Sequence, residues 1–316
     1  MEQRRVGHTG LHVSPVGLGT LTWGRDTDAD TARAQLCAYR DAGGNLIDTA
    51  GNYGDGEAED LLGHLLADTG LARDLVVVSK AGLAPCGQTV APCASRHVML
   101  DALDRTLTAL RRDHLDVWLV QHFDPVTPLD ETLSALTSAV ASGRVRYIGV
   151  SNYPTWALAE IATELRLIRT PLAVLESEYS LLNRDLDKEG FTACERFGAG
   201  VIAWSPLARG VLSGRYRTHT PPDSRAASPH LGGFVKPYLD ERYAGAIEAT
   251  CAAAAGLDLT PAQVAFLWAK DAPGVSSILL GSRTITQLTQ LLDVADDTLP
   301  HQIRHALDDV TADLSA

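Results

Sequence analysis

Four side chains that can exchange or stabilise protons stand at or near the ends of short apolar runs. Asp48 lies in the run NLIDT, Lys80 ends VVVSK and His122 ends WLVQH, while Tyr53 follows Asp48 by five residues. An ammonium group behind a run of valines would be desolvated unless a carboxylate paired with it. We therefore expect Asp48 to lie beside Lys80.

These four residues have a consistent acid–base chemistry. Tyrosine ordinarily loses its proton near pH 10, and the ammonium group of Lys80 would favour the tyrosinate and lower the pKa of Tyr53, which makes Tyr53 a usable proton donor to a carbonyl oxygen. His122 could donate a hydrogen bond to the same oxygen and orient it. A structural Lys80–Asp48 ion pair with a hydrogen-bonded core histidine fits the same spacing, so both interpretations stay open here.

The elements that must position these side chains form a regular series. Short β-rich segments bounded by turn residues predict eight strands, and most are continuous apolar runs, as expected for strands buried on both faces of a parallel sheet. The predicted strands are Val16–Thr20, Asn45–Thr49, Leu75–Lys80, Leu115–His122, Val145–Ser151, Leu172–Tyr179, Gly200–Leu207 and Ser277–Ser282. Apolar spacings of three and four residues predict helices over Ala29–Ala42, Glu57–Leu66, Val98–Leu110, Leu129–Ala141, Thr155–Leu165 and, less regularly, Asp185–Phe197.

Strands that alternate with helices predict an α/β fold, a closed (β/α)8 TIM barrel, whose chemistry lies at the C-terminal ends of the strands. The residues before Val16 predict a β-hairpin around Thr9 and Gly10 that could plug one end of the barrel. The unusually long segment before the last strand includes Arg217–Lys236, which lacks periodicity and is typical of a lid or binding loop. Nothing resembles a linker, so we expect residues 1–316 to form a single domain.

Composition narrows the possible partners. The chain has 316 residues and a net charge of −12, which disfavours binding to nucleic acid or to an anionic membrane surface. The N-terminus does not resemble a signal peptide, and no apolar run is long enough to span a membrane. The five cysteines form no CxxC pair, which favours a cytoplasmic protein with reduced thiols over a disulfide frame or a metal site.

Three other patterns allow a functional and a plainer interpretation. His301 and His305 have a spacing that could bind metal on a helix, but a third ligand is missing, so we expect a solvated helix. Cys86 and Cys93 are expected to be free thiols rather than a redox pair. Trp23 could line a substrate pocket or simply cover the barrel end, and the sequence does not decide between the two.

Seven segments together resemble the aldo-keto reductase family across essentially the whole chain. They are IDTAGNYGDGEAEDLLG, VVVSKAG, LDVWLVQHFDP, GRVRYIGVSNY, ESEYSLLNR, WSPLARGVLSGRY and ILLGSRTITQL. The resemblance is strongest to the long-loop branch that includes bacterial reductases and the β subunits of potassium channels. It implies a catalytic tetrad of Asp48, Tyr53, Lys80 and His122, with Tyr53 as general acid.

The resemblance also implies that NADPH/NADP+ binds without a Rossmann domain. It places Thr20 and Asp48 at the nicotinamide ribose, Ser151, Asn152 and Glu176 at the carboxamide, and the ring of Trp204 on the nicotinamide. It assigns backbone groups of Ser205, Pro206, Leu207 and Ala208 to the pyrophosphate. It assigns the adenosine and its 2′-phosphate to Arg215, Arg225, Gly281, Arg283 and Gln287.

The chain departs from the family pattern at two positions. Glu176 replaces a glutamine whose amide both donates and accepts hydrogen bonds, whereas a carboxylate only accepts. Leu291 replaces an asparagine that usually contacts the adenine. We expect both departures to change how the cofactor is held.

The implied activity is NADPH-dependent reduction of an aldehyde, ketone or keto-sugar carbonyl to an alcohol, with a small-molecule carbonyl compound as the partner. One alternative is a nucleotide-sensing regulatory subunit with little turnover, but those relatives commonly lack a histidine at the position of His122. Another is a barrel lyase or isomerase, which the missing metal cluster and paired carboxylates disfavour. We expect substrate specificity to come from three loops, including Ala81–Arg96. The sequence names neither the substrate nor the oligomeric state.

Overall fold

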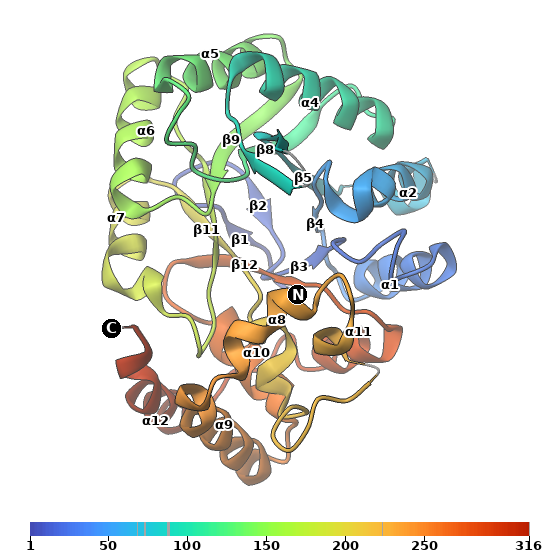
Figure 1. Ribbon diagram of the computed structural model, residues 1–316, viewed down its shortest axis with the longest axis vertical. Helices are drawn as coiled ribbons and strands as arrows, with labels where there is room; N and C mark the ends of the chain where they lie inside the picture. Colours follow the sequence, from blue (N-terminus) through green and yellow to red (C-terminus); the bar gives the residue numbers. More distant parts are fainter. Residues whose placement is uncertain (68, 73, 87–88, 223, 316) are drawn as a thin grey trace.

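Eight parallel strands close into a barrel in the computed structural model, which describes residues 1–67, 69–72, 74–86, 89–222 and 224–315 (Figure 1). Each barrel strand pairs with the next barrel strand along the chain, and the last barrel strand pairs with the first. The barrel strands are β3 (Val16–Gly19), β4 (Leu46–Asp48), β5 (Val76–Ala81), β8 (Leu115–Val120), β9 (Val145–Ser151), β10 (Val174–Glu178), β11 (Gly200–Trp204) and β12 (Val275–Leu280).

Helices surround the strands and cover their outer faces (Figure 1). The order is α1 (Ala29–Asp41), α2 (Glu57–Leu66), α3 (Thr69–Ala72), α4 (Arg96–Leu110), α5 (Leu129–Ala141), α6 (Thr155–Leu167), α7 (Phe191–Phe197), α8 (Gly232–Val235), α9 (Ala244–Leu257), α10 (Pro261–Lys270), α11 (Ile285–Leu292) and α12 (His301–Thr311). Local sequence sets several starts: Asp28 caps α1 by accepting from the Thr31 amide, and Thr260 with Gln263 forms a capping box at α10. The predicted (β/α)8 TIM barrel is therefore confirmed.

Several predicted strands extend beyond the observed ladder, and two of them do so at proposed site residues. The segment predicted as Leu115–His122 ends at Val120, and the segment predicted as Gly200–Leu207 ends at Trp204. The residues that follow each strand leave the barrel as loops, and Pro206 has no amide hydrogen for a ladder. His122 and Ser205 therefore lie on loops at the barrel mouth, not within strands.

Three further segments differ from their predictions. The irregular helix predicted over Asp185–Phe197 is a π-helical turn, Leu186–Gly190, followed by α7. The predicted loop Ala81–Arg96 contains an antiparallel hairpin of β6 (Leu83–Cys86) and β7 (Thr89–Pro92), whose sequence has too little apolar alternation to reveal it. The long segment before β12 holds α9 and α10 as well as an irregular loop, which includes residues 217–222 and 224–236.

The N-terminal hairpin lies at the end of the barrel opposite the functional residues. Its strands β1 (Arg4–Arg5) and β2 (His12–Val13) pair antiparallel, and Val6 and Val13 are buried among residues of the barrel interior such as Leu119. Gly7 has a φ of +51°, and a Cβ there would lie 2.3 Å from the Gly198 carbonyl oxygen. Only glycine allows this approach, so the hairpin seals the N-terminal end.

The plainer interpretations of the remaining patterns agree with the structure. His301 and His305 lie on the exposed face of α12, where His305 Nδ1 is 3.0 Å from Asp309, and the described residues contain no group of three side chains suited to a metal ion. Cys86 and Cys93 are free thiols. Within the described part of the chain, no helix has the length and apolarity needed to cross a membrane.

Candidate active site

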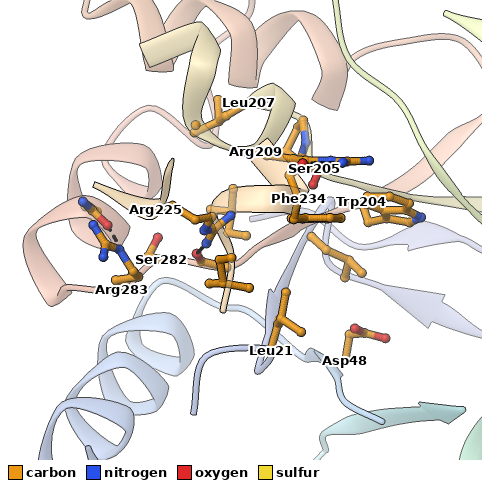
Figure 2. Close-up of a pocket in the computed structure, with 18 of the residues that line it drawn as sticks. Leu21, Asp48, Trp204, Ser205, Leu207, Arg209, Arg225, Phe234, Ser282 and Arg283 are labelled. Carbon is orange, nitrogen blue, oxygen red and sulfur yellow. Dashed lines mark hydrogen bonds between the residues drawn. The ribbon is translucent and has the colours of Figure 1, made fainter. Parts of the chain in front are cut away.

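A cavity of about 610 Å³ opens at the C-terminal ends of the barrel strands. Its size suits a small molecule or a cofactor. Figure 2 shows Asp48 and Trp204 toward one side and Arg225 and Arg283 toward the other, with Phe234 between them. The predicted site residues that line it are Asp48, Tyr53, Lys80, His122, Ser151, Asn152, Glu176, Trp204, Ser205, Pro206, Leu207, Arg215, Arg225, Gly281, Arg283 and Gln287.

Three of the four proposed catalytic side chains meet around one ammonium group. Lys80 Nζ donates to Asp48 Oδ1 at 2.5 Å, to the Thr49 carbonyl oxygen at 3.1 Å and to the Tyr53 hydroxyl at 3.2 Å. The side chains of Lys80 and Asp48 are only 1% and 4% exposed. The expected Lys80–Asp48 pair is confirmed, and adjacent strands β4 and β5 bring it together.

Burial dominates the acid–base properties of this group. Burial alone would lower the pKa of Lys80, but the carboxyl groups of Asp48 and Glu176 raise it above its ordinary value, so Lys80 is an ammonium ion. Burial also raises the pKa of Tyr53, and Lys80 only partly opposes that effect. The expected net lowering of the Tyr53 pKa is therefore wrong for the protein by itself, because desolvation of the tyrosinate outweighs the nearby charge.

His122 lines the same cavity and is half-buried. Burial lowers its pKa, and the positive charge of Lys80 lowers it further. At neutral pH the imidazole is therefore uncharged, and one ring nitrogen can donate a hydrogen bond while the other accepts. This state suits a group that orients a polar ligand beside Tyr53.

Glu176 brings a second carboxyl group to Lys80. Its Oε1 lies 3.4 Å from Lys80 Nζ and accepts a bond of 3.4 Å from the Ser151 hydroxyl. Its Oε2 is buried and has no hydrogen-bond partner among the described residues. Such a buried oxygen is costly when the group is charged, which favours the neutral form of Glu176.

Asn152 links the loop after β9 to the rest of the site. Its amide nitrogen donates to the Gln121 carbonyl and to Ser151 Oγ, at 3.1 and 3.0 Å, and its Oδ1 accepts from Trp204 Nε1 at 3.1 Å. Both amide hydrogens are thus used within the protein, which leaves one lone pair on Oδ1 for a ligand. Asn152 therefore orients the Trp204 ring as well as lining the cavity.

Two residues expected at the cofactor do not line the cavity. Thr20 is fully buried, and its hydroxyl and amide both donate to the Asp48 carbonyl oxygen at 3.0 Å. Ala208 is also fully buried, and its amide donates to the Ser205 carbonyl oxygen. Thr20 thus holds the backbone of Asp48 in place, and the Ala208 amide closes the turn that follows β11.

That turn has an unusual backbone. Ser205, Ala208 and Arg209 have φ values of +55°, +47° and +60°, in the left-handed region that non-glycine residues rarely adopt. Successive left- and right-handed residues turn backbone amides toward a common concavity, which is a geometry suited to anions. Ser205, Pro206 and Leu207 line the cavity at this point.

Two arginines lie at the end of the cavity away from Asp48 (Figure 2). Arg225 Nη2 donates to the Gly281 carbonyl oxygen at 2.9 Å, which joins the irregular loop to the turn after β12. Burial lowers the pKa of Arg225, and the charge of Arg283 lowers it further. Gln287 Oε1 accepts from the Arg283 amide at 3.1 Å at the start of α11. Two like charges close together in a partly buried site favour an anion.

Arg209 is a residue of the site that sequence reasoning missed. Its guanidinium group forms a two-pronged ion pair with Glu178, at 3.0 and 2.6 Å, and donates to the Phe234 carbonyl oxygen. It also packs 3.7 Å from the centre of the Phe234 ring, which stacks on Trp204 with centroids 6.1 Å apart. Arg209 therefore fastens the irregular loop over the cavity. The alternation Glu176–Ser–Glu178 on one strand could have signalled two inward carboxyl groups that require cations.

The structure also decides the role of Trp23 and places Leu291. Trp23 is fully buried in the core, its Nε1 donates to Gln35 Oε1 at 2.9 Å, and it does not line the cavity. Leu291 lines the cavity and is 4% exposed. The departure from asparagine at this position thus gives an apolar wall beside Gln287.

Comparisons with known proteins agree with this geometry. The chain is 32% identical to the oxidoreductase YrpG of Bacillus subtilis (strain 168) over 98% of its length and 96% of that protein. It is 32% identical to the L-glyceraldehyde 3-phosphate reductase of Escherichia coli (strain K12), over 92% of this chain and 86% of that protein. It is 31% identical to a probable voltage-gated potassium channel subunit beta of Oryza sativa subsp. japonica, over 94% and 92% of the two chains.

The sequence profile of the aldo/keto reductase family matches residues 15–311, which include every strand of the barrel and every residue of the cavity. At a general level, this match and the oxidoreductases among the relatives support carbonyl reduction, and aldo/keto reductases generally use nicotinamide cofactors. The chain belongs to the aldo/keto reductase family.

Proposed function

We propose that the protein reduces the carbonyl group of a small aldehyde, ketone or keto-sugar to an alcohol with NADPH, and that Tyr53 is the general acid. The single observation that carries the proposal is the hydrogen bond between Lys80 Nζ and the Tyr53 hydroxyl at the wall of the cavity. Lys80 donates to the tyrosine oxygen, so the phenolic hydrogen is left to point toward a ligand.

When bound, NADPH supplies the hydride. Tyr53 gives its proton to the carbonyl oxygen as that oxygen gains negative charge, and Lys80 stabilises the tyrosinate that forms. Asp48 holds Lys80 in place and balances its charge. Uncharged His122 donates a hydrogen bond that fixes the direction of the carbonyl group.

The far end of the cavity fits the phosphate-bearing part of NADPH. Arg225 and Arg283 bring two positive charges together in an otherwise acidic protein. Guanidinium groups bind phosphates through several donors in a fixed arrangement. We assign the 2′-phosphate, which NADH lacks, to these arginines, with Gln287 and Arg215 nearby in the same cavity.

The test is a panel of aldehydes, ketones and keto-sugars assayed by the loss of NADPH absorbance, with NADH in parallel. We expect turnover with at least one class and a preference for NADPH. Tight NADPH binding without turnover across the panel would instead favour a nucleotide-sensing regulatory subunit; one relative, from rice, is a probable voltage-gated potassium channel subunit beta. Turnover with NADH alone would contradict the assignment of the arginines.

We also propose a cytoplasmic location, because the chain has five free cysteines and no disulfide among them.

A further inference from the structure

Glu176 is a buried acidic side chain that the proposed proton transfer leaves unused. It is 3% exposed and lies in the middle of β10, in register with Ser151 on β9 and Ile202 on β11, neither of which titrates. The charged or titratable groups that interact with it come from the other side of the barrel interior: Asp48 on β4, Lys80 on β5 and Tyr53 in the loop after β4.

The hydrogen atoms of Lys80 are fully used without Glu176. An ammonium group has three, and they go to Asp48 Oδ1, the Thr49 carbonyl oxygen and the Tyr53 hydroxyl. The 3.4 Å contact between Lys80 Nζ and Glu176 Oε1 is therefore a charge contact only. An ionised Glu176 would receive just one long hydrogen bond, from Ser151, and its Oε2 would have none from the described residues.

Two carboxyl groups thus share one cation inside the barrel, and their surroundings differ. Burial raises the pKa of both groups, but Lys80 at 2.5 Å opposes this effect for Asp48. For Glu176 the charge of Asp48 and a hydrogen bond to Asp48 add to the effect of burial, and although Lys80 opposes them the pKa is raised to about 8. At neutral pH the extra proton belongs on Glu176, while Asp48 and Lys80 stay charged.

We infer that Glu176 is a protonated positioning residue, whose O–H donates to Asp48 beside Lys80, and that its ionisation weakens dinucleotide binding at alkaline pH. A neutral acid can donate its O–H to Asp48, whereas a carboxylate has acceptors only and would add a second negative charge beside Asp48, in a cavity that takes an anionic dinucleotide. The inference rests on the proposed function, since it concerns the same nicotinamide site.

The first experiment measures the dissociation constant of NADPH from pH 7 to 9.5 by quenching of tryptophan fluorescence. In this range the phosphates of NADPH stay ionised, since their last pKa is near 6. His122 is uncharged because its pKa is lowered, while Lys80 and Tyr53 keep their protons because their pKa values are raised. For wild type we expect Kd to rise by up to about tenfold per pH unit above pH 8.

Glu176→Gln is the decisive variant, because the amide keeps the donor and the acceptor but cannot ionise. We expect its Kd to match wild type within a few-fold at pH 7 and to stay constant up to pH 9.5. Glu160→Gln is the matched control, since it makes the same charge change at an exposed position on α6. The control should keep the wild-type pH dependence.

A second experiment needs no cofactor. Infrared spectra of the apo protein labelled with ¹³C-glutamate should show a protonated carboxyl band at pH 7 that is lost by pH 9.5 and is missing from Glu176→Gln. Protein stability gives an independent measure. The pKa of Glu176 is higher in the folded protein than in the unfolded chain, so its contribution to the free energy of unfolding is complete below about pH 4.5 and is lost as the pH rises toward 8. The melting temperature of Glu176→Gln should therefore gain on wild type between pH 5 and 8.5.

The outcomes separate the inference from the proposed function. A wild-type Kd that is constant over the whole range, or a Glu176→Gln variant with the same rise as wild type, overturns the inference. Failure to bind NADPH at any pH overturns the proposed function, and the infrared band of the apo protein then decides the state of Glu176. A spectrum at pH 7 without that band overturns the inference whatever the binding data show.

Discussion

At the Asp48 end of the cavity, opposite charges neutralise one another inside the barrel, whereas at the Arg283 end, like charges face one another on loops. Lys80 and Asp48 are almost fully buried and joined at 2.5 Å. Arg225 lies in the irregular loop and Arg283 lies after β12, and both are half-buried. The charge of Arg283 lowers the pKa of Arg225. The first arrangement is complete before a ligand arrives, while the second gains stability from an anionic ligand.

This difference between the two ends of the cavity corresponds to two roles, chemistry at one end and ligand selection at the other. Asp48 and Lys80, which hold and polarise the proposed acid, lie on adjacent strands whose hydrogen-bond ladder fixes their separation. Groups that select a ligand lie on segments joined by a few contacts, such as the Arg225 bond to Gly281 and the Arg209 bond to Phe234. We therefore expect substitutions of Lys80 and Tyr53 to reduce stability or kcat, and substitutions of the arginines to change Kd.

The largest expected effect is on stability. Lys80→Met should reduce the free energy of unfolding by about 3–5 kcal/mol, because Asp48 would then be buried without its partner. Denaturant titration of the apo protein measures this. Arg225→Met, which removes one half-buried cation, is the control, with an expected loss of about 1 kcal/mol. An equal loss of unfolding free energy in the two variants would show that the charges at the two ends of the cavity do not differ in their contribution to stability.

The next effect is on the chemical step. Tyr53→Phe should lower kcat by at least about 10²-fold, since it removes the proposed acid, and should leave NADPH binding and stability nearly unchanged. Steady-state kinetics with the best substrate of the panel, together with a fluorescence titration, separate kcat from Kd. If kcat is unchanged, Tyr53 is not the acid.

The third effect is on cofactor choice. Arg283→Ala should raise Kd for NADPH by roughly ten- to a hundredfold and change Kd for NADH little, because one charge-assisted bond contributes about 1.5–3 kcal/mol. Titrations with both cofactors, in wild type and variant, give the comparison. Equal weakening for NADPH and NADH would mean that Arg283 does not contact the 2′-phosphate.

The smallest effect concerns the fastening of the irregular loop. Arg209→Lys can keep the ion pair with Glu178 but should lose the bond to the Phe234 carbonyl oxygen. One hydrogen bond of about 0.5–1.5 kcal/mol gives an expected rise of roughly two- to tenfold in the rate of NADPH release. Stopped-flow displacement measures that rate, and an unchanged value would show that Arg209 does not hold the loop closed.

Much of the fold followed from local patterns. Apolar runs marked all eight barrel strands to within a few residues, and the positions of Asp48, Lys80 and Ser151 at or near strand ends placed them at one mouth. The hairpin of β6 and β7 did not follow, because its residues are exposed and its pairing depends on loop context. The true ends of β8 and β11 also depended on where the barrel closes.

The sequence by itself determined most of the residues that line the barrel mouth, because apolar runs and side-chain alternation are local properties of the chain. Only the tertiary structure decided how those residues share charge. Burial, which depends on every surrounding element, outweighs the pull of Lys80 on Tyr53 and raises the pKa of Glu176. The contacts of Arg209 with Glu178 and Phe234 likewise join residues 31 and 25 positions away, a proximity that no local spacing encodes.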